Sequence, residues 1–242
     1  MCTVTFIPAG DRVFITSNRD EKHFRSTALP PGVYQHKTGK LLFPRDADAG
    51  GTWLALHENG NAVVFLNGAF KNHMPSPPYR KSRGLILLDV ADSLSPYESF
   101  DYLNLDNIEP FTAIIRQDET LYECRWDGKT KYSTQLDAGS SHIWSSATLY
   151  DDNVQAKRKK WFNEWLQQTP FPDLEDILQF HQFTGDGDAH NDLMMNRDGT
   201  VFTVSITGME LNGKSGIMQY LDLKNQKNIH SGLSFSKATL PR

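Results

Sequence analysis

The stretch MCTVTFIPAGDRVFITSNRDE, residues 1–21, decides the fold, because it has the pattern of an antiparallel hairpin at the beginning of the chain. Residues 3–7 and 12–16 are rich in β-branched and aromatic side chains, as strands are, and residues 8–11 (Pro-Ala-Gly-Asp) have the composition of a turn. The stretch therefore predicts two paired strands, followed directly by the polar run Asn-Arg-Asp-Glu at residues 18–21.

The predicted register brings the first cysteine close to this polar run. With a four-residue turn, Ile7 faces Arg12, and the same antiparallel pairing places Cys2 opposite Ser17. A loop of three or five residues moves this pairing by one position. We therefore expect Cys2 to lie beside Asn18 and the residues that follow it.

A cysteine that becomes the first residue after loss of Met1 carries a nucleophile and a base on the same residue. The unperturbed pKa of an α-amino group is about 7.7–8.0 and that of a thiol is about 8.5, so near neutral pH the amine can accept the thiol proton. A nearby guanidinium favours the thiolate and a carboxylate can hold the amine, which makes Arg19 and Asp20 candidates. The alternative is that Cys2 is an incidental small residue of a first strand and that residues 18–21 form a solvated turn.

Alternation along a regular strand limits which of these residues act together. Neighbouring side chains point to opposite faces, so either Asn18 with Asp20, or Arg19 with Glu21, faces the terminus. All four contribute only if the strand breaks at this point.

These residues resemble the NRDE family, also called the transport and Golgi organisation protein 2 family. The resemblance rests on Met1-Cys2-Thr3 and Ser17-Asn18-Arg19-Asp20-Glu21 and continues through Gly50-Gly51-Thr52-Trp53-Leu54, Asn59-Gly60, Leu66-Asn67 and Ser82-Arg83-Gly84. It implies a fold similar to N-terminal-nucleophile hydrolases, with a more distant likeness to bile-salt hydrolases and penicillin V acylases. In those amide hydrolases an arginine and an aspartate after the first hairpin support the nucleophile, and they correspond to Arg19 and Asp20 here.

The resemblance also supplies the remaining candidate site residues. By likeness to the acylases, Asn67 is a donor to an oxyanion, although a turn-forming Asn-Gly is an equally good interpretation. Glu21, Trp53, Arg83 and Ser146 are candidates for substrate binding. Two departures weaken the amidase interpretation: Ser146 stands where an asparagine is common, and the segment at residues 187–192 lacks a second arginine.

The composition favours one domain, residues 1–242, and the resemblance implies a small-molecule amide or acyl substrate as its partner. Lysine and arginine number 25 against 29 aspartate and glutamate residues, and the basic run at residues 157–160 is typical of a solvated helix face, so nucleic acid is not expected as a partner.

Cys2 and Cys124 form no disulfide framework or zinc-ligand spacing, and the alternating acidic run at residues 186–192 is interpreted as a loop, so neither metal nor cofactor is expected. The longest apolar run, residues 84–91, is too short to span a bilayer, and without a signal peptide the expected location is cytoplasmic.

Element signals along the chain indicate an α+β protein. The Asn-Gly turn near residue 60 predicts a hairpin of residues 52–57 and 62–66, and residues 111–136 have the pattern of an antiparallel meander. Helices are expected over residues 83–93, from residue 96 to 103, from about 153 to 168, and over 173–183, with two final strands near 201–207 and 216–223. Helices on both sides of antiparallel sheets suit a four-layer αββα sandwich.

Two functions fit these expectations. The first is a cysteine N-terminal-nucleophile hydrolase that cleaves the amide bond of a small acyl or aminoacyl compound, with Cys2 as nucleophile and Asn18, Arg19 and Asp20 in support. The second is a carrier on the same fold that binds haem or an acyl-lipid without turnover, as the association of eukaryotic family members with such ligands implies.

Overall fold

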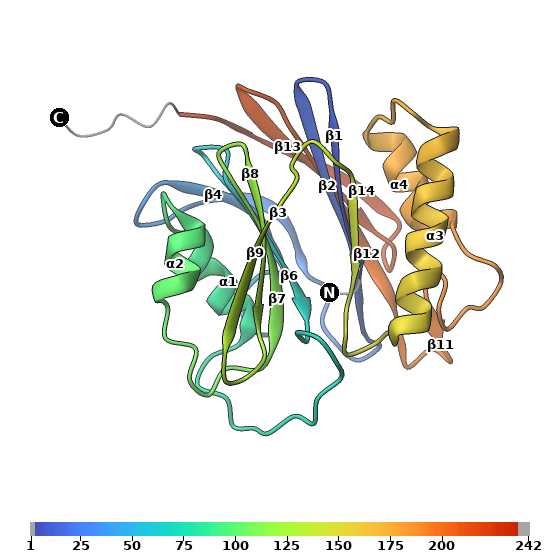
Figure 1. Ribbon diagram of the computed structural model, residues 1–242, viewed down its shortest axis with the longest axis horizontal. Coiled ribbons are helices and arrows are strands. Elements are labelled where there is room, and N and C mark those ends of the chain that lie inside the picture. The colour runs from blue at the N-terminus through green and yellow to red at the C-terminus, as the bar shows by residue number, and fades with distance from the viewer. Residues whose placement is uncertain (1–2, 237–242) are drawn as a thin grey trace.

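Two antiparallel sheets face each other in the computed structural model, which describes residues 3–236 (Figure 1). Sheet A has the strand order β10-β1-β2-β12-β13-β14, with β11 paired to β12. Its strands are β1 (Thr3–Ala9), β2 (Arg12–Lys22), β10 (His142–Ser145), β11 (Asn196–Arg197), β12 (Val201–Leu211), β13 (Ser215–Asp222) and β14 (Lys227–Ser234). Sheet B follows the chain order with β3 (Leu29–Gln35), β4 (Lys40–Arg45), β5 (Leu54–His57), β6 (Ala62–Asn67), β7 (Phe111–Gln117), β8 (Thr120–Trp126) and β9 (Lys131–Leu136).

A pair of helices covers the outer face of each sheet. The helices α1 (Arg83–Ala91) and α2 (Pro96–Tyr102) pack on sheet B, and α3 (Asp152–Gln168) and α4 (Leu174–Phe183) pack on sheet A (Figure 1). Three of them start with ordinary capping chemistry, because the side chains of Ser82, Asp151 and Asp173 each accept a hydrogen bond from a backbone N–H of the first turn, while α2 starts at a proline. The four layers confirm the expected αββα sandwich.

The innermost hydrophobic core lies between the sheets. It combines Val4, Phe6 and Met209 of sheet A with Leu54 and Val64 of sheet B, all buried. Separate clusters join sheet B to α1 and α2, and sheet A to α3 and α4. Because one cluster joins both sheets, it supports our proposal that the chain forms a single domain.

The first hairpin is confirmed, but its turn is shorter than expected. The strands are joined by two residues, Gly10 and Asp11, and Thr3 therefore pairs with Asn18 rather than with Thr16. Gly10 has a φ of 64°, which glycine adopts without strain, and this permits the tight turn. Pro8 continues the strand because β10 pairs with β1 only from Thr3 to Phe6, so no neighbour requires the N–H that proline lacks.

The polar run at residues 18–21 belongs to the second strand, not to a turn after it. Strand β2 continues to Lys22 because β12 pairs with it along that length, with an irregularity between Thr203 and Ser205. The interpretation of this run as a solvated turn is therefore wrong. The shift of register by two residues leaves every side chain of the hairpin on its expected face.

The other predicted elements are present, with β12 extended to Leu211. The strand β14, which pairs with β13 at the edge of sheet A, was not predicted. Its sequence is polar and exposed along most of its length, so it lacks the apolar alternation from which strands are recognised.

Candidate active site

Strand alternation divides the polar run between the two faces of sheet A. Asn18 and Asp20 point towards the helix layer, where their side chains bond to His181 and Tyr150. Arg19 and Glu21 point towards sheet B, where both line a pocket. Each of the two pairs anticipated from the sequence therefore shares a face of the sheet, and the terminus that one pair was expected to face lies outside the described residues.

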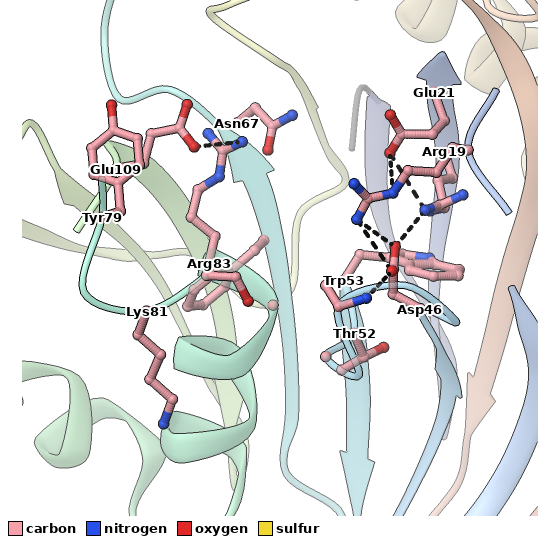
Figure 2. A pocket seen from close by; sticks show the side chains of 16 residues that line it. Arg19, Glu21, Asp46, Thr52, Trp53, Asn67, Tyr79, Lys81, Arg83 and Glu109 are labelled. Atoms are coloured by element: carbon pink, nitrogen blue, oxygen red, sulfur yellow. Dashed lines mark hydrogen bonds and ion pairs between the residues drawn. The ribbon is translucent and has the colours of Figure 1, made fainter. Parts of the chain in front are cut away.

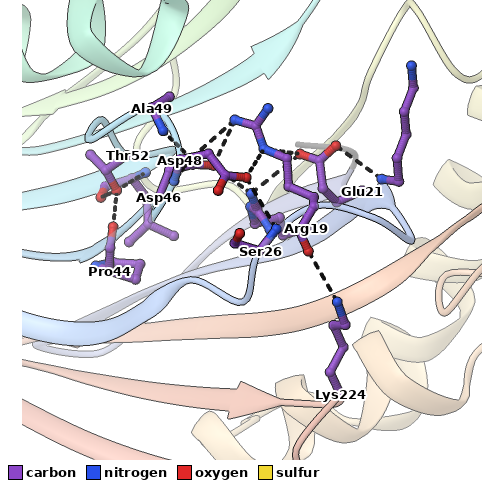
Figure 3. Close-up of polar contacts among 12 residues, drawn as sticks. Arg19, Glu21, Ser26, Pro44, Asp46, Asp48, Ala49, Thr52 and Lys224 are labelled. Carbon is purple, nitrogen blue, oxygen red and sulfur yellow. Dashed lines mark hydrogen bonds and ion pairs between the residues drawn. The ribbon is translucent and has the colours of Figure 1, made fainter.

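On the face towards sheet B, Arg19 is held in an ionic cluster that includes a residue not anticipated from the sequence (Figure 3). Its Nη2 is 2.7 Å from Oδ2 of Asp46 and 3.4 Å from Oε2 of Glu21. Its guanidinium carbon lies 4.6 Å from the ring centroid of Trp53, and only 5% of its side chain is exposed. Packing and charge together fix this guanidinium in place.

Asp46 is the anionic centre of this cluster. It accepts hydrogen bonds from Arg19, from Arg25 and from the backbone N–H groups of Asp48 and Ala49. Burial alone would raise the pKa of Asp46, but the donors from Ala49, Arg25 and Arg19 outweigh it and hold that pKa below its ordinary value of 3.8. Asp46 is therefore an ionised carboxylate at neutral pH that balances two guanidinium groups.

The opposite wall of the pocket comes from the ends of β6 and α1 (Figure 2). There Nη2 of Arg83 is 3.1 Å from Oε2 of Glu109, and Asn67 and Tyr79 lie beside this pair. The cavity between the walls measures about 460 Å³, a size typical of small-molecule sites. Arg19, Glu21, Trp53, Asn67 and Arg83 are thus brought to one cavity.

On the helix-facing side, Asp20 is buried and hydrogen-bonded. Its Oδ2 accepts a hydrogen bond of 2.7 Å from the Tyr150 hydroxyl, and its Oδ1 accepts one of 2.6 Å from Oγ1 of Thr203. These bonds hold the carboxylate on the helix-facing side of sheet A. Asp20 is one residue away from Arg19, which lies on the side towards sheet B.

The Asn18 carboxamide is engaged with α4 and the segment that follows it. It donates to the backbone carbonyls of His181 and Leu193, and its Oδ1 lies 2.5 Å from Nδ1 of His181. Burial, reinforced by the charge of Arg158, lowers the pKa of His181 to about 3, so this imidazole is neutral and acts as a hydrogen-bonding spacer. The side chain of Asn18 therefore anchors the hairpin to the helix layer.

Ser146 and Asn67 meet beside the first described residue of β1. Ser145 pairs with Thr3, and the next residue, Ser146, donates its hydroxyl to the backbone oxygen of Asn67 at 2.9 Å. Ser146 is buried and does not line the pocket around Arg19. This bond joins the end of β6 in sheet B to the edge of sheet A.

Cys2 lies outside the described residues, and the nucleophile role expected of it is taken up below as a proposal. The second cysteine, Cys124, is fully buried in β8. Burial raises the pKa of its thiol to about 12. Cys124 is therefore a thiol that is protonated and inaccessible at neutral pH.

Several buried polar residues at this end of the molecule were not anticipated from the sequence. They are Asp46, Tyr150, Arg158 and His181, together with the half-buried Arg25. Arg158 was expected on a solvated helix face with its basic neighbours, and this was wrong, because the side chain is fully buried. A signal for it exists, since Arg158 precedes the buried Phe162 by four residues and so shares its face of α3.

Other sequence features concern ligands and membranes. The acidic run includes Asp186, whose carboxylate pairs with Lys157 at 2.6 Å. Within residues 3–236, no group of three or more His, Cys, Asp or Glu side chains is arranged to hold a metal ion. In the same part of the chain, no helix has both the length and the apolar character needed to cross a bilayer.

Comparison with known proteins places this geometry in context. The family model described as Transport and Golgi organisation 2 matches residues 1–201, while no curated protein matches the sequence. The fold is similar to that of the Caenorhabditis elegans N-acylethanolamine-hydrolyzing acid amidase ortholog, with a TM-score of 0.58, 11% identity, and coverage of 86% of this chain and 92% of that chain.

Two variant structures of the conjugated bile acid hydrolase from Clostridium perfringens are also similar. Their TM-scores are 0.53 and 0.55 at 10% identity, with coverage of 98% and 100% of this chain and of 98% and 99% of theirs. At these identities the likeness shows the fold, and it confirms the expected similarity to N-terminal-nucleophile hydrolases.

Proposed function

The chain belongs to the Transport and Golgi organisation 2 family, and on that premise we propose that it is a cysteine N-terminal-nucleophile hydrolase that cleaves the amide bond of a small, polar acyl or aminoacyl compound. The observation that carries the proposal is the position of Arg19. Its guanidinium is fixed in the wall of the cavity on the strand that pairs with the start of β1.

The register of the hairpin supports a role for Arg19 beside the nucleophile. Val4 and Phe6 point into the space between the sheets, as Arg19 does, and Thr3 pairs with Asn18, the neighbour of Arg19. The proposal requires the Cys2 thiol to lie on this same face. There the guanidinium favours the thiolate that attacks the substrate carbonyl, while the α-amine takes the thiol proton and later returns it to the leaving amine.

Asp20 and Asn67 take the supporting roles in this proposal. The Asp20 carboxylate, held by Tyr150 and Thr203, is the group that orients the α-amine from the helix-facing side. Asn67 lines the cavity at the end of β6, and its carboxamide is the donor to the oxyanion that forms when sulfur attacks. Asn18 and Ser146 are assigned to support, since their polar groups bond to His181 and to the Asn67 backbone.

The charge of the cavity walls supports a polar substrate. Seven acidic or basic side chains line the cavity among the described residues: Arg19, Glu21, Arg25, Asp46, Lys81, Arg83 and Glu109. A long acyl chain or a haem ring would remove water from these groups without replacing their hydrogen bonds, which is costly. A short acyl group that carries a carboxylate would instead replace water with charge-assisted hydrogen bonds. The walls thus favour the amidase over the carrier of haem or acyl-lipid.

Replacement of Arg83 by methionine is expected to change substrate binding rather than chemistry. For succinyl p-nitroanilide, KM should rise about tenfold or more with kcat nearly unchanged, because an ionic contact made equally in the ground and transition states is lost. Butyryl p-nitroanilide, in which a methyl group replaces the carboxylate, should show little change.

The matched control for this experiment is Lys81→Met. Lys81 also lines the cavity, but its Nζ lies 2.5 Å from Oδ2 of Asp89, and its side chain points away from Arg83 (Figure 2). The assignment of Arg83 would be contradicted if Arg83→Met raised KM equally for the succinyl and butyryl substrates. It would also be contradicted if Lys81→Met raised KM for the succinyl substrate as much as Arg83→Met does.

Selective alkylation tests the proposed nucleophile. With intact mass first used to establish loss of Met1, substoichiometric iodoacetamide at pH 7 should label Cys2 and leave Cys124 unmodified, because the pKa of the Cys124 thiol is about 12 and its side chain is buried. Peptide mapping measures both sites in one sample. Retention of Met1, or labelling of Cys2 no faster than that of a free cysteine, would count against an activated terminal thiol.

A further inference from the structure

Arg158 is a fully buried arginine on α3 that reaches the beginning of the first strand. None of its surface is exposed, and its Nη1 donates to Oγ1 of Thr3 at 2.5 Å. Its Nε and Nη2 donate to the backbone oxygen of Asn191 at 3.2 and 3.0 Å, and Nη2 also donates to that of Asp192 at 2.7 Å. The guanidinium therefore fastens Thr3 to the segment after α4.

The same guanidinium stacks on the residue that holds Asp20. Its central carbon lies 3.6 Å from the ring centroid of Tyr150, whose hydroxyl donates to Asp20 at 2.7 Å. Arg158 thus contacts β1 through Thr3 and supports β2 through Tyr150. These are the two strands whose ends carry the proposed nucleophile and the carboxylate proposed to orient it.

The charge of Arg158 is not balanced by a direct ion pair. In the described part of the chain its partners are a hydroxyl and backbone carbonyl oxygens, and no salt bridge to it is formed. Placing a cation in such a site is costly, so packing alone gives little reason for an arginine there. The charge also acts on a buried neighbour: burial is the main cause of the lowered pKa of His181, and the charge of Arg158 lowers it further.

We propose that Arg158 is a positioning residue for the amino-terminal nucleophile, which clamps the first strand through Thr3 and uses its charge to keep the adjacent α-amine in the neutral, proton-accepting form. This inference rests on the proposed function for its purpose. The clamp and the electrostatic effect, however, can be measured without turnover.

Covalent geometry makes the electrostatic part quantitative. Thr3 is one residue from the amine of position 2, so the amine and the guanidinium are separated by no more than about 10 Å. At an effective dielectric constant of about 20, a unit charge at that distance lowers the pKa of an amine by about one pH unit. Among the described residues, the other charged or titratable groups around this end of the hairpin include Arg19 and Asp20 from β2, Tyr150 from the loop before α3, His181 from α4, Asp192 from the segment after α4 and Arg197 from β11.

The test measures the pKa of the α-amine in a Cys2→Ala background, which removes the thiol and makes turnover irrelevant. Competitive acetylation with acetic anhydride across pH 5–10, read by mass spectrometry of the amino-terminal peptide, gives that pKa. Arg158→Met should raise it by about one pH unit, because a neighbouring cation has been removed. Arg158→Lys retains the charge and should change it by a few tenths at most. An unchanged pKa in folded Arg158→Met would overturn the proposal.

Thr3→Val provides a second variant in case Arg158→Met does not fold. It keeps the shape of Thr3 and all charges but removes the hydroxyl that anchors Nη1, so we expect a smaller rise of the amine pKa in the same direction. No rise in folded Thr3→Val, when Arg158→Met is unfolded, would also overturn the proposal.

Activity separates this inference from the proposed function. With Cys2 intact, Arg158→Met should move the acid limb of kcat/KM to higher pH, and Arg158→Lys should not. A protein that shows the amine shift but hydrolyses no amide would refute the hydrolase and leave the clamp in place. If both Arg158→Met and Thr3→Val hydrolyse the amide and the acid limb of kcat/KM is unshifted in each, the clamp is refuted and the hydrolase proposal stands.

Discussion

Cys2→Ala is expected to reduce amide hydrolysis by at least about a thousandfold while leaving the fold intact. The proposed mechanism has no other group that can form the acyl-enzyme, because the attacking atom is the sulfur of that residue. Succinyl p-nitroanilide is a suitable substrate, since release of p-nitroaniline is measured directly. Binding of the substrate to the variant should persist, because the substitution leaves unchanged the described residues that line the cavity.

Cys124→Ala is the matched control for this result. It also removes a thiol, but from the core of sheet B, far along the chain from the cavity residues of β2. We expect kcat and KM close to those of the unmodified protein, with a modest loss of thermal stability from the small cavity. Retention of full activity by Cys2→Ala, with Met1 shown to be absent by mass, would exclude the mechanism.

Asp46→Asn is expected to lower the free energy of unfolding by about 3 kcal/mol, because it removes the closest counter-ion of two guanidinium groups. Arg19 and Arg25 both bond to this carboxylate, and the side chain of Asp46 is only 12% exposed. The same change should reduce turnover, since Arg19 loses its shortest ionic contact. Denaturant unfolding at pH 7 measures the first effect and the p-nitroanilide assay the second.

The lowered pKa of Asp46 also gives the stability loss a definite dependence on pH. A carboxyl group with a depressed folded pKa contributes stability that is complete above its unfolded pKa, here 3.8, and is lost as the pH falls through the folded value. The difference between the unmodified protein and Asp46→Asn should therefore be largest near neutral pH. It should narrow at pH values below 3.8.

Asp48→Asn distinguishes the buried carboxylate from an exposed one in the same cluster. Oδ2 of Asp48 lies 3.5 Å from Nε of Arg25, but its side chain is 42% exposed and does not reach Arg19. We expect the unfolding midpoint of Asp48→Asn to match that of the unmodified protein, because most exposed ion pairs contribute little to stability. Equal destabilisation by the two substitutions would show that Asp46 is not the anchor of Arg19.

Local signals in the sequence were sufficient for the elements that position the site. The two runs around Gly10 predicted the first hairpin, and Asn59-Gly60 predicted β5 and β6, because strand composition and turn chemistry act over a few residues. The turn length was wrong because Pro8 and Ala9 were assigned to the turn. Their place in the strand depends on where β10 stops pairing, which lies more than 130 residues further along the chain.

The ionic partners of the site depend on contacts between distant segments. Asp46 lies in the loop after β4, 27 residues from Arg19, and nothing in its local sequence distinguishes it from Asp48. Arg158 was hidden within a basic run, although the period of the buried face of α3 passes through it. The helical period alone, without regard to residue type, predicts that Arg158 lies on the buried face of α3.

The family resemblance brought together residues that local patterns could not. Trp53, Asn67 and Arg83 are separated in the sequence and lie on β5, β6 and α1 or beside them, yet all line one cavity with Arg19. Only the alternation of β2 decides that Asp20 faces the other way, and alternation was part of the sequence argument. Which face carries the cavity could not be predicted, because it depends on how the sheets pack.

Trapping of the acyl-enzyme tests the central proposal most directly. The protein is mixed with p-nitrophenyl acetate, quenched in acid within the first turnover, and digested at low pH for mass spectrometry of the amino-terminal peptide. We expect one acetyl group on Cys2, attached as a thioester that hydroxylamine removes, and none on Cys124. Enzyme-dependent release of p-nitrophenol over several turnovers, with no acetyl group found on Cys2, would contradict the assignment of the nucleophile.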